Sequence, residues 1–303
     1  MSSTTLRVLV AWRPGAPGGE AMAQAAWLAR TCRVRIRTVA VLSRGWPLTT
    51  LARGSSDDSW TKTEIRATEK AIRAAGKAHG IRKGMLDDNP TLVVEAHEEA
   101  SALTAAARDF GADLIIVGTR AHSPTGRFRT GATADALLHH SPIPVALTPR
   151  APKLSKNGVT RITCTYLDTA QSHRALERAA DLALDWDVPL RLLALTPRGA
   201  TMYPTDSGFG TDEDLIVEWQ EQAMALLDRG LDRAVTRHPD LHVQLEVGSG
   251  HGWEGAVGSV KWKKGDLAVI GSSGLAPFGR VFTGTSVNHM VKHIPSPMII
   301  TPA

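Results

Sequence analysis

DLIIVGTRAHSPTGRFRTGATADALLHHSPIPVALTP, residues 113–149, aligns without a gap on DLAVIGSSGLAPFGRVFTGTSVNHMVKHIPSPMIITP, residues 266–302. The two stretches are identical at 13 of 37 positions, and most of the identities are Gly, Pro, Thr and the opening Asp-Leu. Turn and helix-cap residues repeated at one spacing indicate two copies of one structural unit. The sequence therefore predicts two domains, residues 1–150 and 158–303, joined near the polar stretch APKLSKNG that begins at Ala151.

Composition favours a globular, cytoplasmic protein. The 303 residues are 43% hydrophobic and 21% charged, which is enough apolar material for two cores. No run approaches the ~18–20 apolar residues that cross a bilayer, and the opening MSSTTLRVLVAW lacks the pattern of a secretory leader. Cys32 and Cys164 have no metal-site or disulfide-framework spacing, which favours two reduced thiols. We therefore expect a cytoplasmic location and no membrane contact.

Positive charge is concentrated in the first half of the chain. The formal net charge of +5 divides into +7 for residues 1–150 and −2 for the remainder. The arginines between positions 30 and 37 alternate with apolar residues as in a strand, and no basic stripe interleaved with aromatic residues follows, so nucleic acid is not an expected partner. Lys261, Lys263 and Lys264 precede an apolar run, where a solvated helix end is the ordinary interpretation.

Short β-branched runs alternate with longer amphipathic segments in both copies. The strands expected are residues 6–12, 34–42, 91–96, 114–117 and 145–148, then 162–166, 190–196, 241–247, 267–270 and 298–301. The helices expected in the first copy are residues 20–30, 59–79, 100–110 and 132–140, and one in the second copy begins near residue 212. This alternation predicts an α/β fold with a doubly wound parallel sheet in each half, in which ligands bind at the carboxyl ends of the strands.

A glycine pattern follows the fourth expected strand of the second copy. Gly271, Ser272 and Gly274 are followed nine residues later by Gly284, Thr285 and Ser286, which open a helix. Glycines let the backbone approach a ligand closely, and amides at a helix N-terminus together with hydroxyls can hold phosphate oxygens. A tight turn and a helix cap are the alternative interpretation of the same glycines.

This G-x2-G-x9-G-[ST] pattern, in two repeated domains over essentially the whole chain, resembles the universal stress protein family in its tandem form. The resemblance implies two Rossmann-like domains of the adenine nucleotide alpha hydrolase-like type, each a five-stranded parallel sheet with helices on both faces. One branch of that family binds ATP through the motif, and another branch lacks the motif and does not bind the nucleotide. For this chain the resemblance implies ATP as the cofactor, with or without Mg. Carried onto this chain, the cofactor-binding residues expected are Tyr166, Asp168, Leu195, Gly271, Ser272, Gly274, Gly284, Thr285, Ser286 and Val287.

The first copy departs from the pattern. Gly118 and Gly131 match, but Ala121 replaces the second glycine and Ala132 the hydroxyl residue. The family tends to place an acidic residue after the first strand. Arg13 stands there with Trp12 beside it, so the indole either fills the adenine volume or packs under a helix while Arg13 points to solvent.

The second copy departs from the family pattern in two places. Leu167 occupies the acidic slot and Asp168 follows it by one residue. Where the family usually has Gly-x-Pro, the chain reads GSGHG at residues 248–252, which we interpret as a turn in preference to a second phosphate loop. His289 and His293 are four residues apart, and without a third ligand in the sequence they are interpreted as a helix-surface pair.

Three functions stay open from the sequence. The first is a non-enzymatic stress-response sensor or regulator that binds an adenine nucleotide in its second domain. The second is a nucleotide-free interaction scaffold, which the missing acidic residues favour. The third is a slow ATP hydrolase, for which Asp168 is the one candidate carboxylate in the sequence.

The final strand of each copy follows a Pro-x-Pro and would leave an exposed apolar sheet edge. Pairing Val145–Thr148 with Met298–Thr301 inside one chain would cover both edges. This predicts a pseudo-twofold intramolecular dimer, and the resemblance implies that whole chains can also form a homo-oligomer.

Overall fold

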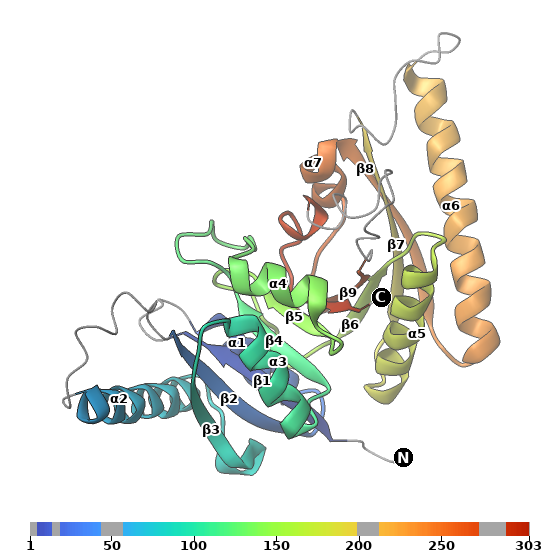
Figure 1. Cartoon of the computed structure of the whole chain (residues 1–303). Helices are drawn as coiled ribbons and strands as arrows, with labels where there is room; N and C mark the ends of the chain where they lie inside the picture. Colours follow the sequence, from blue (N-terminus) through green and yellow to red (C-terminus); the bar gives the residue numbers. More distant parts are fainter. Residues whose placement is uncertain (1–4, 14–18, 44–56, 199–211, 273–288, 303) are drawn as a thin grey trace.

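The protein is built around one ten-stranded sheet (Figure 1). In the computed structural model the described residues are 5–13, 19–43, 57–198, 212–272 and 289–302. The strand order is β3-β2-β1-β4-β5-β10-β9-β6-β7-β8, so the first half of the chain supplies one half of the sheet and the second half supplies the other. All neighbours pair in parallel except β5 and β10.

The first domain alternates strands and helices in the expected order. Its elements are β1 (Leu6–Trp12), α1 (Glu20–Leu28), β2 (Val34–Ser43), α2 (Asp57–Ala78), a short 3-10 helix (Lys83–Met85), β3 (Leu86–Ala96), α3 (Glu99–Phe110), β4 (Leu114–Gly118), α4 (Ala132–His140) and β5 (Val145–Thr148). The last turn of α3 ends where Gly111 takes a left-handed conformation with φ 64°, which favours glycine. β3 starts five residues earlier than the apolar pattern predicts, because its first residue, Leu86, already pairs with Ile36 of β2.

The second domain repeats this order. Its elements are β6 (Arg161–Thr165), α5 (Ala170–Asp185), β7 (Leu190–Arg198), α6 (Asp212–Arg237), β8 (Val243–His251), α7 (Gly252–Gly258), β9 (Asp266–Gly271) and β10 (Met298–Thr301). α5 starts at an N-cap, Thr169, whose hydroxyl accepts a hydrogen bond from the backbone N–H of Ser172.

The domains meet strand against strand. β10 runs antiparallel to β5, with Met298 opposite Leu147 and Ile300 opposite Val145. These are the two strands that the sequence analysis places at the junction. Because each strand covers the other's edge, neither leaves a row of unpaired backbone groups for another chain.

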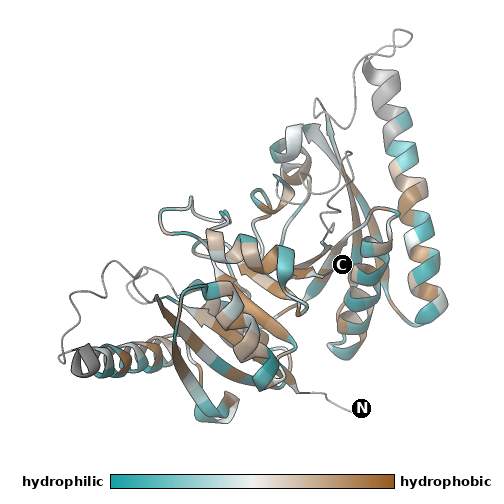
Figure 2. Cartoon of the chain, in the orientation of Figure 1, coloured by the Kyte–Doolittle hydropathy of each residue, from teal (hydrophilic) through white to brown (hydrophobic). Residues whose placement is uncertain are grey.

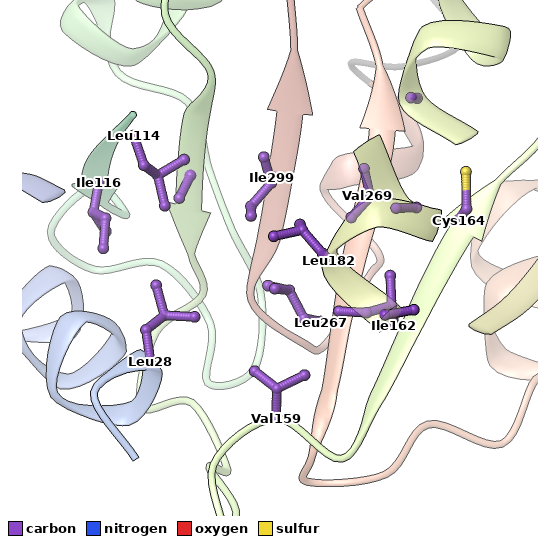
Figure 3. Close-up of a cluster of buried hydrophobic side chains, with 14 of the residues drawn as sticks. Leu28, Leu114, Ile116, Val159, Ile162, Cys164, Leu182, Leu267, Val269 and Ile299 are labelled. Atoms are coloured by element: carbon purple, nitrogen blue, oxygen red, sulfur yellow. The ribbon is translucent and has the colours of Figure 1, made fainter. Parts of the chain in front are cut away.

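Apolar side chains cover both faces of the sheet (Figure 2). One face packs against α1, α2, α5 and α6, and the other against α3, α4 and α7. Figure 3 shows that the first of these cores continues through the junction, from Leu28 and Ile116 past Ile299 to Val269 and Cys164. Burial raises the pKa of the Cys164 thiol to about 12, so this cysteine is an inert apolar group in the core.

The expected turn at residues 248–252 is wrong, because β8 continues to His251 and α7 begins at the next residue. A Cβ on Gly250 would lie 2.4 Å from the backbone of Gly255, and one on Gly248 would lie 2.6 Å from the carbonyl oxygen of Ala256. The glycines therefore let α7 pack directly on the strand that precedes it. That requirement comes from tertiary packing and leaves no local signature that distinguishes it from a turn.

A charged cluster lies at the amino ends of β6, β7 and β9. The buried carboxylate of Asp266 accepts hydrogen bonds from Arg161 Nε at 2.8 Å and Nη2 at 2.7 Å, and pairs with Arg191 at 3.5 Å. Arg191 also binds Glu246 at 2.8 Å and lies 5.0 Å from the ring centre of Trp262. Burial, and then the nearby Arg161, lower the pKa of Arg191, while Glu246 and Asp266 favour its charged form.

Candidate functional site

A cavity of about 410 Å³ lies at the carboxyl ends of β6 and β7. Leu167 follows β6, and Ala194, Leu195 and Thr196 belong to β7. Leu167 is 42% exposed, so part of its apolar side chain is open to solvent. In a doubly wound sheet, the carboxyl ends of the strands are the edge at which ligands bind.

One face of α6 forms the opposite wall. Gln222, Leu226 and Arg229 are spaced four and three residues apart, so they lie on one side of the helix, and Ala225 joins them. The sequence analysis did not single out these residues. Their helical spacing in the segment after residue 212 was the signal that could have found them.

Asp168 lies on the rim, held by two side chains. Its Oδ1 is 2.8 Å from His173 Nε2, and its Oδ2 accepts a hydrogen bond from Arg229 Nε at 3.1 Å. The hydrogen bonds from His173 and then from Arg229 lower the pKa of Asp168, so it is a carboxylate at neutral pH. Asp168 therefore orients Arg229, which is itself part of the cavity wall.

Tyr166 is the expected site residue whose side chain the structure places away from the cavity. The ring lies in the core, 1% exposed, and a Cβ on Gly230 of α6 would be 2.9 Å from it. The phenol ring thus packs under α6. The backbone N–H of Tyr166 donates a hydrogen bond to the carbonyl of Leu193. Of the expected residues, Leu195 lines the cavity and Asp168 borders it through Arg229.

The start of the glycine motif packs against α5. A Cβ on Gly271 would lie 2.6 Å from the carbonyl oxygen of Gln171, so only glycine lets β9 and the start of α5 come this close. The backbone N–H of Ser272 donates to Thr301 at 2.9 Å and extends the sheet. Gly274, Gly284, Thr285, Ser286 and Val287 lie outside the described residues.

The described residues fit the base end of a nucleotide. An apolar floor of two leucines suits a flat heterocycle, and Gln222, Thr196 and Arg229 supply hydrogen-bonding groups at its edges. A magnesium ion has no comparable support, because the described part of the chain contains no group of three or more His, Cys, Asp or Glu side chains placed to hold a metal.

The corresponding end of the first domain has a cavity of about 440 Å³ with both polar and apolar lining residues. Trp12 forms part of its wall and packs against the adjoining core, so the indole does not fill the space as one interpretation of the sequence had it. The Arg13 side chain is 59% exposed, as the second interpretation has it, and its guanidinium also binds Glu99 at 2.8 Å and Thr133 at 3.1 Å. The hydroxyl of Thr133 donates to the same carboxylate oxygen.

The two domains therefore form a tandem pair of Rossmann-like α/β units, each with a cavity at the carboxyl ends of its strands. The chain matches the Universal stress protein family twice, over residues 5–149 and 158–302. A universal stress protein of Mycobacterium tuberculosis (strain ATCC 25618 / H37Rv) is 28% identical over 299 residues, covering 98% of this chain and 100% of the relative. The chain belongs to the universal stress protein family, in its tandem form.

Solved structures show the same fold. A universal stress protein from Archaeoglobus fulgidus DSM 4304 superposes with a TM-score of 0.60 at 15% identity, covering 97% of this chain and 98% of that one. A functionally unknown protein from Pseudomonas aeruginosa PAO1 gives a TM-score of 0.52 at 14% identity, with 98% and 92% covered. Family membership supports a role in the stress response. Within the described residues, no helix is both long and apolar enough to span a membrane.

Proposed function

We propose that this protein is a non-enzymatic stress-response sensor or regulator that binds an adenine nucleotide, ATP, in its second domain. The observation that carries the proposal is the cavity with Leu167 and Leu195 on its floor, at the carboxyl ends of β6 and β7. The glycine motif continues from the carboxyl end of β9, the strand that pairs in parallel with β6, so it starts at the same edge of the sheet. Covering an exposed leucine with a flat base removes apolar surface from water, at ~25 cal/mol per Å² buried. The motif after Gly271 would then receive the phosphates.

The two domains have different parts in this proposal. The first domain lacks the second motif glycine, where Ala121 stands, and its cavity wall carries the contacts of Arg13 with Glu99 and Thr133. A base bound there would lie beside this ion pair, which the second domain's cavity does not have among its described residues. The first domain therefore acts as the structural partner that covers the edge of β10.

One observation favours a second candidate, a nucleotide-free interaction scaffold. The family tends to place an acidic residue at the position that Leu167 occupies, and Asp168 follows it. The Asp168 carboxylate already binds His173 and Arg229. A ribose hydroxyl would have to displace one of these partners or share the carboxylate with it. In the scaffold alternative the Asp168 contacts persist and the cavity serves no nucleotide.

Filling the cavity from α6 tests the nucleotide proposal. Ala225 lines the cavity from an exposed position, so Ala225→Trp places an indole in the space that the base would use. We expect a loss of ATP affinity of roughly tenfold or more, which is about 1.4 kcal/mol. Isothermal titration calorimetry on the whole chain measures it.

The matched control is Met224→Trp on the same helix. Met224 is 41% exposed and is not part of the cavity wall, so this variant carries the same added indole without filling the site. Unchanged ATP binding in Met224→Trp and weakened binding in Ala225→Trp support the proposal. Absence of any ATP heat for the unmodified protein, with no nucleotide in mass spectra of ligand released on denaturation, favours the scaffold.

A further inference from the structure

We propose that a second, cationic site lies at the junction of the two domains and binds a small molecule carrying several phosphate groups. A cavity of about 630 Å³ separates the segment Thr125 to Arg127 and the linker from α7 and from the segments that precede β9 and β10. Its size is that of an ordinary ligand pocket, for which ~300–1,000 Å³ is usual. Both domains contribute lining residues, so the site exists only in the paired chain.

Charge on the cavity wall is predominantly positive. Arg127, Lys153, Lys263 and Lys264 line it, with Glu254 as the one carboxylate among its described lining residues. That carboxylate is occupied by Arg127 at 2.8 Å. None of the ion pairs formed among the described residues includes the three lysines. Three exposed lysines thus line one cavity without an anionic partner from the described chain, which points to an anionic ligand.

Two further groups suit such a ligand. His293 lines the cavity, and its Nδ1 is buried without a hydrogen-bond partner in the described part of the protein. Burial, and then the nearby Arg127, lower the pKa of His293, so the ring is neutral at neutral pH and can still donate one N–H. Trp262 closes another side, fixed by its indole N–H to the carbonyl of Val257 at 3.0 Å.

The walls of this junction cavity are held together across the domains. The Arg127 guanidinium donates to the carbonyl of His293 at 2.6 Å as well as to Glu254. The backbone of Gly126 and Arg127 forms hydrogen bonds in both directions with Arg150, at 2.8 and 3.0 Å. On the other side, the N–H of Ser155 donates to the carbonyl of Lys264 at 2.9 Å. The backbone segments that carry Arg127 and Lys264 are therefore in place before a ligand arrives, which reduces the cost of binding.

The lysines are peculiar to one copy of the repeat. Lys263 and Lys264 stand three and two residues before Asp266, and the residues at the same distance before Asp113 are Phe110 and Gly111. Phe110 is buried beneath the guanidinium groups of Arg7 and Arg37. The duplication that produced the fold therefore does not explain the positive charge at this junction, and the nucleotide motif does not use it.

Ammonium groups act as separate point charges, so they favour a ligand whose negative charges are spread over several groups. Inorganic tripolyphosphate is a probe with that property and without a base. We expect it to bind to the whole chain in calorimetry at constant ionic strength. Citrate at the same concentration distinguishes phosphate recognition from attraction to any polyanion.

The double variant Lys263→Glu with Lys264→Glu should weaken tripolyphosphate binding by about tenfold or more, since two attractive charges become repulsive. Lys77→Glu with Lys83→Glu is the matched control, because these exposed lysines lie in the first domain outside the cavity and change the net charge equally. Equal loss in both variants, or no loss in the first, overturns the proposal. So does citrate binding as tightly as tripolyphosphate.

A measurement without variants guards against a folding defect. Tripolyphosphate should protect Lys153, Lys263 and Lys264 from acetylation by acetic anhydride, read by mass spectrometry, and leave Lys77 reactive. Both experiments are repeated in Gly274→Leu, in which the proposed nucleotide site is impaired. Tripolyphosphate binding that persists there while ATP binding is lost assigns the two ligands to different sites, and binding lost there rejects the junction site.

Discussion

The carboxyl ends of β1 and β6 are equivalent positions in the two domains, and they carry different side chains. In the first domain Arg13 binds Glu99 and Thr133 at the wall of the cavity. In the second, Leu167 lies exposed over an apolar floor and Asp168 is turned to the rim. The two sites therefore differ although they stand on the same kind of strand–helix scaffold.

The helix that starts above each site differs as well. A Cβ on Gly118 would be 3.8 Å from the backbone of α1, an ordinary contact, whereas one on Gly271 would be 2.6 Å from the carbonyl oxygen of Gln171 in the first turn of α5. α1 therefore leaves room beside Gly118, where the first domain's cavity is lined by Gly19, Glu20 and Ala21. In the second domain α5 closes that space, and the described cavity lies farther along, between β7 and α6.

The two domains should differ most in the stability contributed by the aspartate at the amino end of the fourth strand of each copy. Asp113 and Asp266 are equivalent in the repeat, but Asp113 is exposed and accepts the backbone N–H of Arg7, whereas Asp266 is fully buried and binds two guanidinium groups. Asp266→Ala should lower the free energy of unfolding by about 3–5 kcal/mol, because it leaves buried arginines uncompensated. Asp113→Ala should cost only about 1 kcal/mol, the worth of one exposed hydrogen bond.

Urea unfolding of both variants, followed by far-ultraviolet circular dichroism, measures these two losses. The control for size and charge at the same cluster is Asp266→Asn, which keeps hydrogen-bond acceptors and should be less damaging than alanine. Similar losses for Asp113→Ala and Asp266→Ala would contradict the view that burial, and not position in the repeat, sets the energy of these carboxylates.

Much of the fold follows from the sequence because the deciding signals are local. The repeat, the β-branched runs and the helix-ending Gly111 predict the order of strands and helices. β1, α4, β5 and β10 have the predicted bounds, since each is a short apolar or amphipathic run between turn residues. The pairing of β5 with β10 required one further step, that two exposed apolar edges are better joined than left free.

The misses have a common physical cause in contacts between distant residues. The sequence around Gly248 and Gly250 is typical of a turn, whereas these glycines are required by the packing of α7 against β8. Arg191 and Asp266 give no sign in the sequence that they are buried as a pair, because each alone is a typical surface residue. The helical spacing of Gln222, Leu226 and Arg229 is visible in the sequence, but only the packing of α6 beside β7 shows that this face forms a cavity wall. Tyr166 was assigned to a site although Gly230 packs on its ring.

Next in expected size is the difference in nucleotide affinity between the domains. Gly274→Leu puts a side chain where the motif requires the backbone to approach phosphate, and we expect ATP affinity to fall by about 100-fold, or roughly 2.7 kcal/mol. Ala121→Leu, the equivalent change in the first domain, should leave ATP affinity unchanged. Calorimetry with ATP on both variants measures the two effects.

The stoichiometry of the unmodified protein is the internal control for that pair, and one ATP per chain is expected. Two ATP per chain, or equal losses in Gly274→Leu and Ala121→Leu, would sink the assignment of different roles to the two domains. An intact urea midpoint for Gly274→Leu shows that the loss arises at the site and not from unfolding.

The smallest effect concerns the exposed contacts at the rim of the second site, and it depends on pH. The hydrogen bonds from His173 and then Arg229 lower the folded-state pKa of Asp168. A depressed pKa means that the contribution to stability is present above the unfolded value of ~3.9 and is lost as pH falls through the folded pKa. Asp168→Asn should therefore be slightly less stable than the unmodified chain at pH 6 and equally stable near pH 2.

Thermal unfolding at a series of pH values measures this difference, which should be smaller than either preceding effect because water screens the Asp168 carboxylate. His173→Gln is the matched variant, since it removes the first of the two partners and keeps the carboxylate together with Arg229. If that variant loses about half of the pH-dependent difference, both partners hold Asp168. Asp168 then orients Arg229 at the cavity of the second domain. A difference between Asp168→Asn and the unmodified chain that grows toward low pH would have the wrong sign and would reject this account of the rim.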